Sequence, residues 1–451
     1  MITIPAQTFV SLCVILIVLH MIVLSTAYLI FLERKVASWT QDRIGPNRAM
    51  FTFGQENWLS KVPVLNLLTK HRLFGLGQAL ADGVKLVVKE DYTPPRVDRV
   101  LFLAAPALAV IPAMIGWAVI PWGGAWNFPG LSLFGLVEVA PGLVSVAVAP
   151  LNVGVVYILA IGSLAVYGVV VGAYASNNKY SFLGGLRATA QMLSYEIPMG
   201  LCVLLMILTY GTGDLALMVG LQSAGGTGGA GIGLGPEGHT WGLIMHPVIA
   251  LIFFTCVLAE CNRAPFDLAE AEQELVGGFH TEYGSLKWGL FFLGEYMHMI
   301  TGCAFFAAMF LGGWDISPLV GLMPGVANFG GEGWLGGLLL VLLKFGVFAG
   351  KVTLLLFVMM WIRWSLPRFR FDQLMKLAWR GMIPLMLTYL VVFAVVVYAG
   401  WGHWLVYLVL NLAVAAAAAV ISPRLPQGPP VNRRVALAGS RFSPLPSEGR
   451  P

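Results

Sequence analysis

Charged residues are scarce in this chain of 451 residues. Asp, Glu, Lys and Arg make up 11% of it, and hydrophobic residues make up 58%. Soluble domains carry more charge, about 25%. The mean hydropathy is +0.80, and apolar runs long enough to cross a bilayer, about 18 residues or more, recur along the chain. A water-soluble protein is therefore excluded, and the pattern predicts an all-α polytopic membrane protein.

Reactive sulfur is also scarce. The five cysteines are Cys13, Cys202, Cys256, Cys261 and Cys303, and they form no Cys-x-x-Cys pair. Their scatter lacks the Cys/His spacing of zinc and iron–sulfur ligands. We expect buried thiols and no bound metal or iron–sulfur cluster.

Nine apolar stretches have the length of membrane-spanning helices, about 20 residues for a slab of ~30 Å. They lie near 9–32, 100–120, 150–173, 189–210, 243–260, 287–312, 334–362, 381–400 and 403–421. No basic segment precedes the first stretch, which predicts a retained helix and not a cleaved signal.

Lys and Arg are missing from the predicted loops 121–149, 211–242 and 313–333. They gather instead in the other loops and in the Pro/Arg-rich tail 422–451. The positive-inside rule then places the N-terminus outside and the tail in the cytoplasm of a bacterial-type membrane, and the ninth span is needed for this alternation. We expect the Gly-rich outer loops to be flexible connectors, and the tail to be disordered and held near anionic lipid.

One cytoplasmic segment predicts an amphipathic helix. Within residues 76–90, the apolar side chains and the charged side chains fall on opposite faces at helical spacing. The apolar face holds Leu76, Ala79, Leu80, Val84 and Val87, and the charged face holds Asp82, Lys85 and Lys89. Such a helix either rests at the lipid boundary or roofs a cavity that admits a lipid-soluble ligand.

An acidic cassette, residues 259–283, holds six of the 22 acids. Pro265 is expected to end the preceding helix. Beyond it, Asp267, Glu270 and Glu274 are predicted to share one helical face, with Glu272 on another. Crowded carboxylates raise at least one pKa, which suits a group that holds or relays a proton. A solvated loop that docks a basic partner subunit remains the alternative.

Ionisable side chains inside the predicted spans cost several kcal/mol and typically mark a proton path or a buried ion pair. Counting Asp, Glu, Lys and Arg away from the ends of the spans, four occur: Glu196, Glu295, Lys344 and Lys351. The two lysines lie seven residues apart, hence on one helical face, and are expected to pair with acids of facing helices. A purely structural pairing is the alternative.

The motifs from Glu33 to about Arg380 resemble those of one family when taken together and in order. They are Glu33-Arg-Lys35, Arg43-Ile-Gly-Pro-Asn47, Ala81-Asp-Gly-Val-Lys-Leu86, Ser163-Leu-Ala-Val-Tyr167, Gly185-Leu-Arg-Ala188, Ser194-Tyr-Glu196, the acidic cassette, Gly294-Glu-Tyr296, Trp361-Ile-Arg363 and Leu366-Pro-Arg-Phe-Arg-Phe-Asp-Gln-Leu374. This set is similar to the H subunit of proton-pumping NADH:quinone oxidoreductase, which is respiratory complex I. In the mitochondrial complex the equivalent chain is membrane subunit 1.

The resemblance implies a subunit that forms the membrane side of a quinone chamber, with quinone as substrate and no complete active site in this chain alone. Its chamber and entrance would map onto Arg34, Arg43, Asp82, Arg263, Asp267, Glu270, Glu272 and Glu274. Its proton relay would map onto Glu196, Glu260 and Glu295, with Lys351 as an intramembrane partner.

Partners implied by the resemblance are hydrophilic subunits that carry the terminal iron–sulfur cluster, neighbouring small membrane subunits, and lipid. No iron–sulfur cluster, flavin or metal would be bound by this chain, and no nucleic acid. The membrane anchor of an energy-converting hydrogenase is the alternative. A secondary transporter is disfavoured because no inverted repeat is visible. Residues 49–73 look inserted beside the expected entrance.

Overall fold

The computed structural model describes residues 2–49, 73–133, 137–223, 241–270, 272–316 and 334–421. These residues are mostly helical, and eight of their helices are long and apolar enough to cross a membrane. The predicted fold class, an all-α polytopic membrane protein, is confirmed. The tail 422–451, the Gly-rich segment 225–238 and nearly all of the insertion 49–73 lie outside the described residues.

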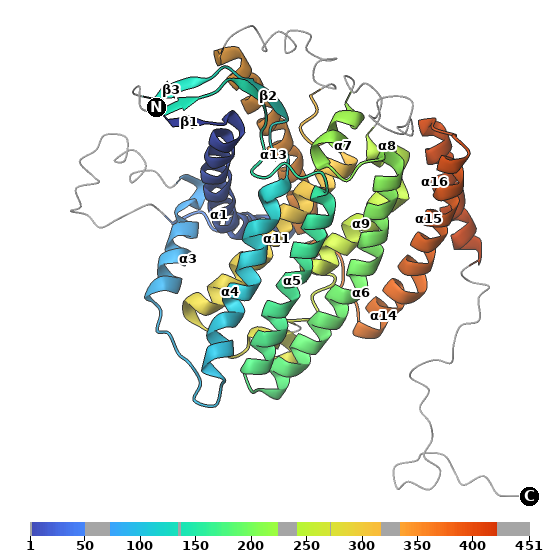
Figure 1. The fold of residues 1–451 in the computed structure, drawn as a ribbon. Coiled ribbons are helices and arrows are strands. Elements are labelled where there is room, and N and C mark those ends of the chain that lie inside the picture. The colour runs from blue at the N-terminus through green and yellow to red at the C-terminus, as the bar shows by residue number, and fades with distance from the viewer. Residues whose placement is uncertain are drawn as a thin grey trace, which may run out of the picture.

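The long helices stand side by side as one bundle (Figure 1). They are α1 (Ala6–Thr40), α4 (Arg99–Gly116), α5 (Gly154–Ala175), α6 (Lys179–Tyr210), α11 (Ser285–Phe310), α13 (Trp334–Ser365), α15 (Ile383–Tyr398) and α16 (Trp404–Ile421). A 3-10 turn (Trp117–Val119) prolongs α4, and α14 (Phe371–Lys376) with a π-helical turn (Leu377–Met382) leads into α15.

The fifth predicted stretch, 243–260, is a broken helix. It consists of α8 (Gly242–Met245) and α9 (Pro247–Glu260), and α9 has 14 residues. The break falls at His246 because Pro247 has no N–H to donate and its ring clashes with a preceding helical turn. The nine expected spans therefore appear as eight long helices and one interrupted one within the described chain.

Helix α1 is longer than expected. The apolar stretch was predicted to end at Leu32, but the helix continues to Thr40. Nothing between Glu33 and Thr40 breaks a helix, since Gly and Pro first occur after it at Gly45 and Pro46. As a result Glu33 is buried on the helix and does not lie in a loop.

The first outer loop, expected to be a flexible connector, is instead built from short strands. β2 (Ala125–Phe128) pairs antiparallel with β5 (Gly142–Ser145), and β3 (Leu131–Leu133) pairs antiparallel with β4 (Val137–Val139). β1 (Ile2–Ile4) joins β4 in parallel, at the end of the bundle where the chain begins (Figure 1). The prediction of a flexible connector was wrong for this loop because the backbone groups pair along strands.

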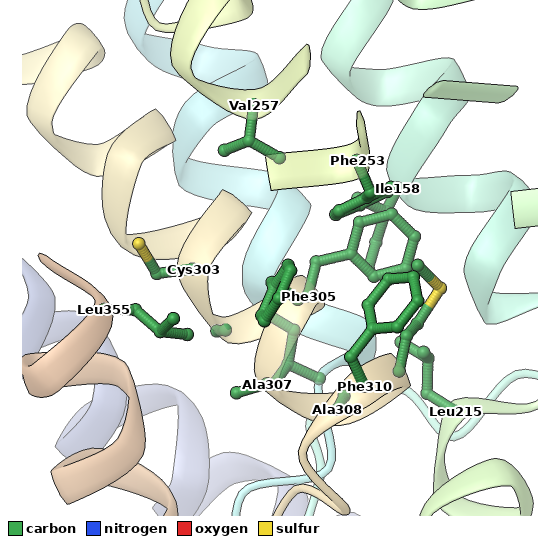
Figure 2. Packing of buried hydrophobic residues seen from close by; sticks show 14 of the residues in the cluster. Ile158, Leu215, Phe253, Val257, Cys303, Phe305, Ala307, Ala308, Phe310 and Leu355 are labelled. Atoms are coloured by element: carbon green, nitrogen blue, oxygen red, sulfur yellow. The ribbon is translucent and has the colours of Figure 1, made fainter. Parts of the chain in front are cut away.

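Helix α11 is the centre of the core. In the most apolar stretch of α11, 67% of the residues are buried. The corresponding share is 22% in α1 and 11% in α16. Phe305 and Phe310 of α11 meet Phe253 of α9, and Leu355 reaches Cys303 from α13 (Figure 2). Close packing of this kind holds membrane helices together, since lipid tails are as apolar as the side chains.

The helices α4 and α5 approach so closely that a side chain would not fit between them. A Cβ atom at Gly168 would lie 2.6 Å from the backbone nitrogen of Ala109. Small residues at such crossings let two backbones come together in a membrane. This contact fixes α5, the helix that carries Gly162 and Ser163 toward the acidic side chains described below.

Five shorter elements connect the bundle at its ends. They are α3 (Gly77–Val88), α7 (Leu215–Gln222), α10 (Glu272–Leu275) and 3-10 turns at Leu73–Gly75 and Gly278–His280. Helix α3 stands at the edge of the bundle next to α1 (Figure 1), and it also contacts α11.

Candidate functional site

A cavity of about 1000 Å³ lies between α1, α3, α11 and the end of α13. Its wall combines aromatic rings with charged groups. It is lined by, among others, Glu33, Arg34, Arg43, Asp82, Lys85, Lys89, Tyr283, Trp288, Phe292, Tyr296, Arg363 and Trp364. A volume of this size is at the upper end of the range for small-molecule sites, about 300–1,000 Å³.

Helix α3 covers this cavity with its charged face. Asp82, Lys85 and Lys89 line the cavity, whereas Val84 and Val87 point outward and are exposed. The predicted amphipathic helix is present and roofs the cavity. Ala79, which was predicted on its apolar face, lines the cavity together with the charged residues. Arg34 of α1 holds the roof through Asp82, with 2.7 Å between Nη1 and Oδ2.

A buried cluster of acids and arginines adjoins the cavity through Glu33, Tyr296 and Arg363, which line it. Glu33 of α1 pairs with Arg363 at the end of α13. The guanidinium of Arg263 lies 3.8 Å from Glu33 and 3.7 Å from Glu295. The hydroxyl of Tyr296 donates a hydrogen bond to Glu33. Four segments far apart in the sequence therefore meet at one point.

Arg263 is held without full hydrogen bonding. Its Nε and Nη2 atoms find no hydrogen-bond partner among the described residues, and its guanidinium lies 4.2 Å from the ring centroid of Tyr296. Burial lowers the pKa of Arg263, but Tyr296, Glu295 and Glu33 outweigh it and raise that pKa above its usual value. The side chain stays a cation, and its charge can stabilise an anion on either neighbouring carboxyl.

Asp267 forms a second buried pair beside this cluster. Nη2 of Arg368 donates to its Oδ2 at 2.9 Å. Burial and repulsion from Glu270 raise the pKa of Asp267 to about 7, although Arg368 opposes the shift. Glu270 itself lies 4.0 Å from the ring of His280. The acidic cassette therefore holds a carboxyl that changes charge near neutral pH.

The cassette does not form the predicted helix. Residues 261–270 form turns and irregular backbone, and the following α-helix covers only Glu272–Leu275, so Asp267, Glu270 and Glu274 do not share one helical face. That prediction was wrong because burial of the segment against the bundle overrides helical periodicity. The side chain of Glu272 lies outside the described residues.

Two of the predicted chamber residues stand apart from the buried cluster. Glu274 is exposed and pairs with Arg187 of α6, with 2.6 Å between Oε2 and Nη1. Arg43 lines the cavity but is exposed, and it bonds to Gln41. Glu274 is placed as a surface contact, whereas Arg34, Arg43 and Asp82 border the cavity.

Glu196 and Glu260 meet at two consecutive residues of α5. The hydroxyl of Ser163 donates to Glu196, and the carboxyl of Glu260 lies beside Gly162, where a Cβ would be 3.2 Å from Oε1. The two carboxyls are close enough to act electrostatically on each other. The structure thus brings together two of the three predicted relay acids in the middle of the bundle, and Glu295 belongs to the arginine cluster.

Lys351 lies elsewhere. Its ammonium donates to the carbonyls of Leu311 and Gly313, at 2.7 and 2.9 Å, and stands over the ring of Trp241. Leu311 follows the end of α11, about 24 Å along that helix from Glu295 at ~1.5 Å per residue. Lys344 lies over Trp314 in the same region. The loop after α11, and not the relay acids, surrounds both lysines.

Sequence reasoning passed over three residues that the cluster depends on. Glu33, Tyr296 and Arg363 stood inside the quoted motifs but were not selected as site residues. Glu33 and Arg363 lie at the ends of apolar stretches, where a charge costs little, and Tyr296 follows Glu295 within α11. Within the described chain, no group of three or more His, Cys, Asp or Glu side chains could hold a metal ion.

Comparison with known proteins agrees with this picture. The sequence profile of the NADH dehydrogenase family matches residues 13–394. The chain is 38% identical to an H subunit of the NADH-quinone oxidoreductase of Cytophaga hutchinsonii over 81% of this chain and 90% of that protein. It is 39% identical to an H subunit of the enzyme of Geobacter sulfurreducens over 85% and 93% of the two chains. The H subunit of Leptospira biflexa is 40% identical over 80% and 88%.

The chain belongs to the family of NADH-quinone oxidoreductase H subunits. This confirms the family predicted from the motifs. The matched region runs from the second turn of α1 to near the end of α15, so the cavity and the buried cluster lie within the part shared with the family.

Proposed function

We propose that this chain is the membrane subunit of an NADH:quinone oxidoreductase and that its cavity is the membrane-side part of the quinone chamber. The observation that carries this proposal is the cavity of about 1000 Å³ between α1, α3 and α11, in a chain of this family. Aromatic side chains suit the flat quinone ring, and polar groups suit its carbonyl oxygens. Electrons come from a partner subunit that carries an iron–sulfur cluster.

The charged wall supplies what quinone reduction requires. Reduction to the quinol consumes two protons, so charge changes beside the ligand. Glu33, Glu295 and Arg263 sit close enough to respond, since charges interact strongly in a low-dielectric interior. We assign Arg34, Arg43 and Asp82 to the chamber wall and entrance, and Arg263, Asp267 and Glu270 to its charged inner side.

The relay of the same function runs from Glu295 to Glu260 and Glu196. Its support is the meeting of Glu260 and Glu196 at Gly162 and Ser163. Partners are the other subunits of the complex and the lipid of a bacterial inner membrane, with the N-terminus outside and the tail in the cytoplasm. The names of the relatives favour this function over a hydrogenase anchor.

The chamber is tested by filling it. Gly83 lines the cavity, and a Cβ there meets no atom within 4 Å, so Gly83→Phe adds a ring to the cavity wall without a clash at Cβ. We expect quinone reduction by NADH to fall at least about tenfold, which corresponds to roughly 1.4 kcal/mol. NADH oxidation with a water-soluble electron acceptor should stay unchanged.

The matched control is the next residue on the same helix. Val84 is exposed on the outer face of α3, so Val84→Phe adds the same ring outside the cavity. Native gels check that both complexes assemble. Native quinone reduction and inhibitor sensitivity in Gly83→Phe would refute the chamber.

The relay is tested by removing one ionisable group at a time. Glu196→Gln, Glu260→Gln and Glu295→Gln keep size and hydrogen bonding but cannot carry the proton. Because a positioned proton donor or acceptor contributes about 10²–10⁴-fold, each should lower proton pumping by reconstituted complex at least tenfold. Pumping and turnover at native levels in all three would exclude this path, and Asp372→Asn at an exposed site serves as the control.

A further inference from the structure

A small cavity lies between α4, α5, α6, α9 and α11, away from the large one. Its volume is about 30 Å³, and the polar residues of its lining are Glu260, Cys261, His298 and Thr301. A buried water occupies about 10–15 Å³ measured this way. The space therefore suits one or two waters, and at least two polar partners face it.

His298, which lines this cavity, has an unused ring nitrogen. Its Nε2 is enclosed and has no hydrogen-bond partner among the described residues. A buried ring nitrogen without a partner costs free energy, which a bound water recovers. The same point in space also adjoins Glu260: a Cβ at Gly162 would lie 3.2 Å from Oε1 of Glu260 and 3.9 Å from Cε1 of His298.

His298 also stands between the two halves of the acidic path. It follows Glu295 by three residues on α11, so the two side chains lie on the same face of the helix, about 5–6 Å apart at Cβ. Glu295 belongs to the arginine cluster at the large cavity, whereas Glu260 and Glu196 meet on the far side at α5. No other described histidine lines either cavity.

We propose that His298 and the water in this cavity carry protons between Glu295 and Glu260. An imidazole accepts a proton on one ring nitrogen and releases another from the second, so charge crosses the ring without any bond to carbon changing. The water takes the released proton and passes one of its own to the carboxylate of Glu260. The net step moves one proton from Glu295 to Glu260 and leaves His298 neutral.

The groups facing His298 are consistent with this role. Glu260 and Cys261 face it from the end of α9, Thr301 lies on its own helix, and α4 and α5 contribute only Pro112, Ala113 and other uncharged residues at this cavity. The hydroxyl of Thr301 is committed to the carbonyl of Met297. The carboxyl of Glu260 is therefore the acid available to the water on this side.

The proposal rests on the relay proposed above, so its test uses Glu260→Gln as a reference in the full, reconstituted complex. His298→Phe keeps an aromatic ring at this position but removes both ring nitrogens. Gly162→Ala keeps the histidine and puts a methyl group into the cavity, against the carboxyl of Glu260. Gly346→Ala, at a membrane-helix glycine whose Cβ meets nothing within 4 Å, is the control for a glycine change.

We expect His298→Phe and Gly162→Ala each to lower proton pumping at least about tenfold. The double variant should be no worse than either, because both remove the same step. In both single variants the remaining turnover should slow more in D2O than native turnover does, which a loss of packing alone would not cause. Gly346→Ala should pump normally.

Two results overturn the proposal, and they are distinguishable. In the first, Glu260→Gln stops pumping, but His298→Phe and Gly162→Ala pump at the native ratio of protons to NADH. His298 and its water then carry no proton, whereas the relay through Glu260 is retained. If Glu260→Gln itself pumps normally, the relay and this step fail together. Should His298→Phe fail to assemble on a native gel, native pumping by Gly162→Ala still refutes the water.

Discussion

At the scale of single residues, the protonation of Asp267 links the stability of this protein to pH. Its carboxyl is buried and pairs with Arg368, yet burial and Glu270 raise its pKa to about 7. An Asp in an unfolded chain loses its proton near pH 4. Between about pH 4 and 7 the folded protein therefore holds a proton that the unfolded chain has released.

The sign of the resulting pH dependence follows from this difference. Where the folded state binds more protons than the unfolded state, stability falls as pH rises. The contribution of Asp267 is thus complete below about pH 4 and lost as pH rises through about 7. We expect Asp267→Asn to flatten this decline, measured as the apparent melting temperature of the purified complex between pH 5 and 8.

The control for this prediction is a carboxyl at the surface. Asp372 is half exposed and pairs only with Lys376 one turn away, so Asp372→Asn should leave the decline unchanged. A native pH slope in Asp267→Asn would show that the carboxyl is already ionised at pH 5 and that Arg368 outweighs burial.

The sequence indicates which single residues carry costly charges, but it does not indicate which of them lie together in the fold. An intramembrane Glu295 and an acidic cassette are visible because charge at those positions is costly. That Glu33, Arg263, Glu295 and Arg363 form one cluster is not visible, since the four belong to separate segments and apolar periodicity carries no distance information. For the same reason, the prediction that placed Lys351 with the relay acids did not anticipate its hydrogen bonds to the carbonyls that follow α11.

At the scale of elements, a buried polar side chain of α16 hydrogen-bonds to the start of α9, the longer part of the broken helix. Oδ1 of Asn411 accepts the N–H of Val248, at 3.0 Å, in the first turn of α9. The first four N–H groups of a helix have no partner within it, and lipid offers none. The hydroxyl of Tyr389 on α15 donates to the carbonyl of Asn411, at 2.7 Å, which ties α15 to the same point.

Replacing this side chain should loosen α9 where it begins. Asn411→Leu keeps the volume but removes the acceptor, and a polar contact between membrane helices is worth about 0.6–1.7 kcal/mol. We expect hydrogen exchange at residues 247–251 to become about 3- to 17-fold faster, given that 1.4 kcal/mol is about tenfold, as followed by mass spectrometry.

Leu412 offers the matched control, because it neighbours Asn411 but is 50% exposed on the outer side of α16. Leu412→Ala should leave exchange in α9 at the native rate. Exchange that accelerates equally in both variants would mean that packing of α16, and not the hydrogen bond, protects the helix start.

Helices were predicted well, because their length and apolar composition identify them. Short strands were predicted poorly, because they depend on pairing with distant segments. Each long apolar stretch contains a helix because a chain in lipid must satisfy its backbone internally. The strands β2 to β5 were missed since they are only three or four residues long and lie among Gly and Pro. The break at His246 was missed because the stretch remains apolar across Pro247.

At the scale of the whole molecule, function is concentrated around the most buried helix. Helix α11 supplies Glu295, Tyr296 and His298, and it borders both cavities. The peripheral helices α1, α13 and α16 leave large apolar side chains exposed, among them Leu16, Leu354 and Val409. This distribution matches a subunit whose outer surface meets lipid and neighbouring membrane chains, with its chemistry held inside.

The pairing of β1 with β4 at one end of the bundle also constrains the order in which this protein is assembled. β1 precedes the first membrane helix, yet its partner β4 follows the second, so Ile2 meets Val137 only after both helices are in the bilayer. Contacts between such distant parts of a chain form late, because a long loop must close first. The side chain of Gln7 then forms hydrogen bonds with the backbone N–H and carbonyl of Ser145. These bonds join α1 to strand β5. The beginning of the chain is therefore among the last parts to find its place.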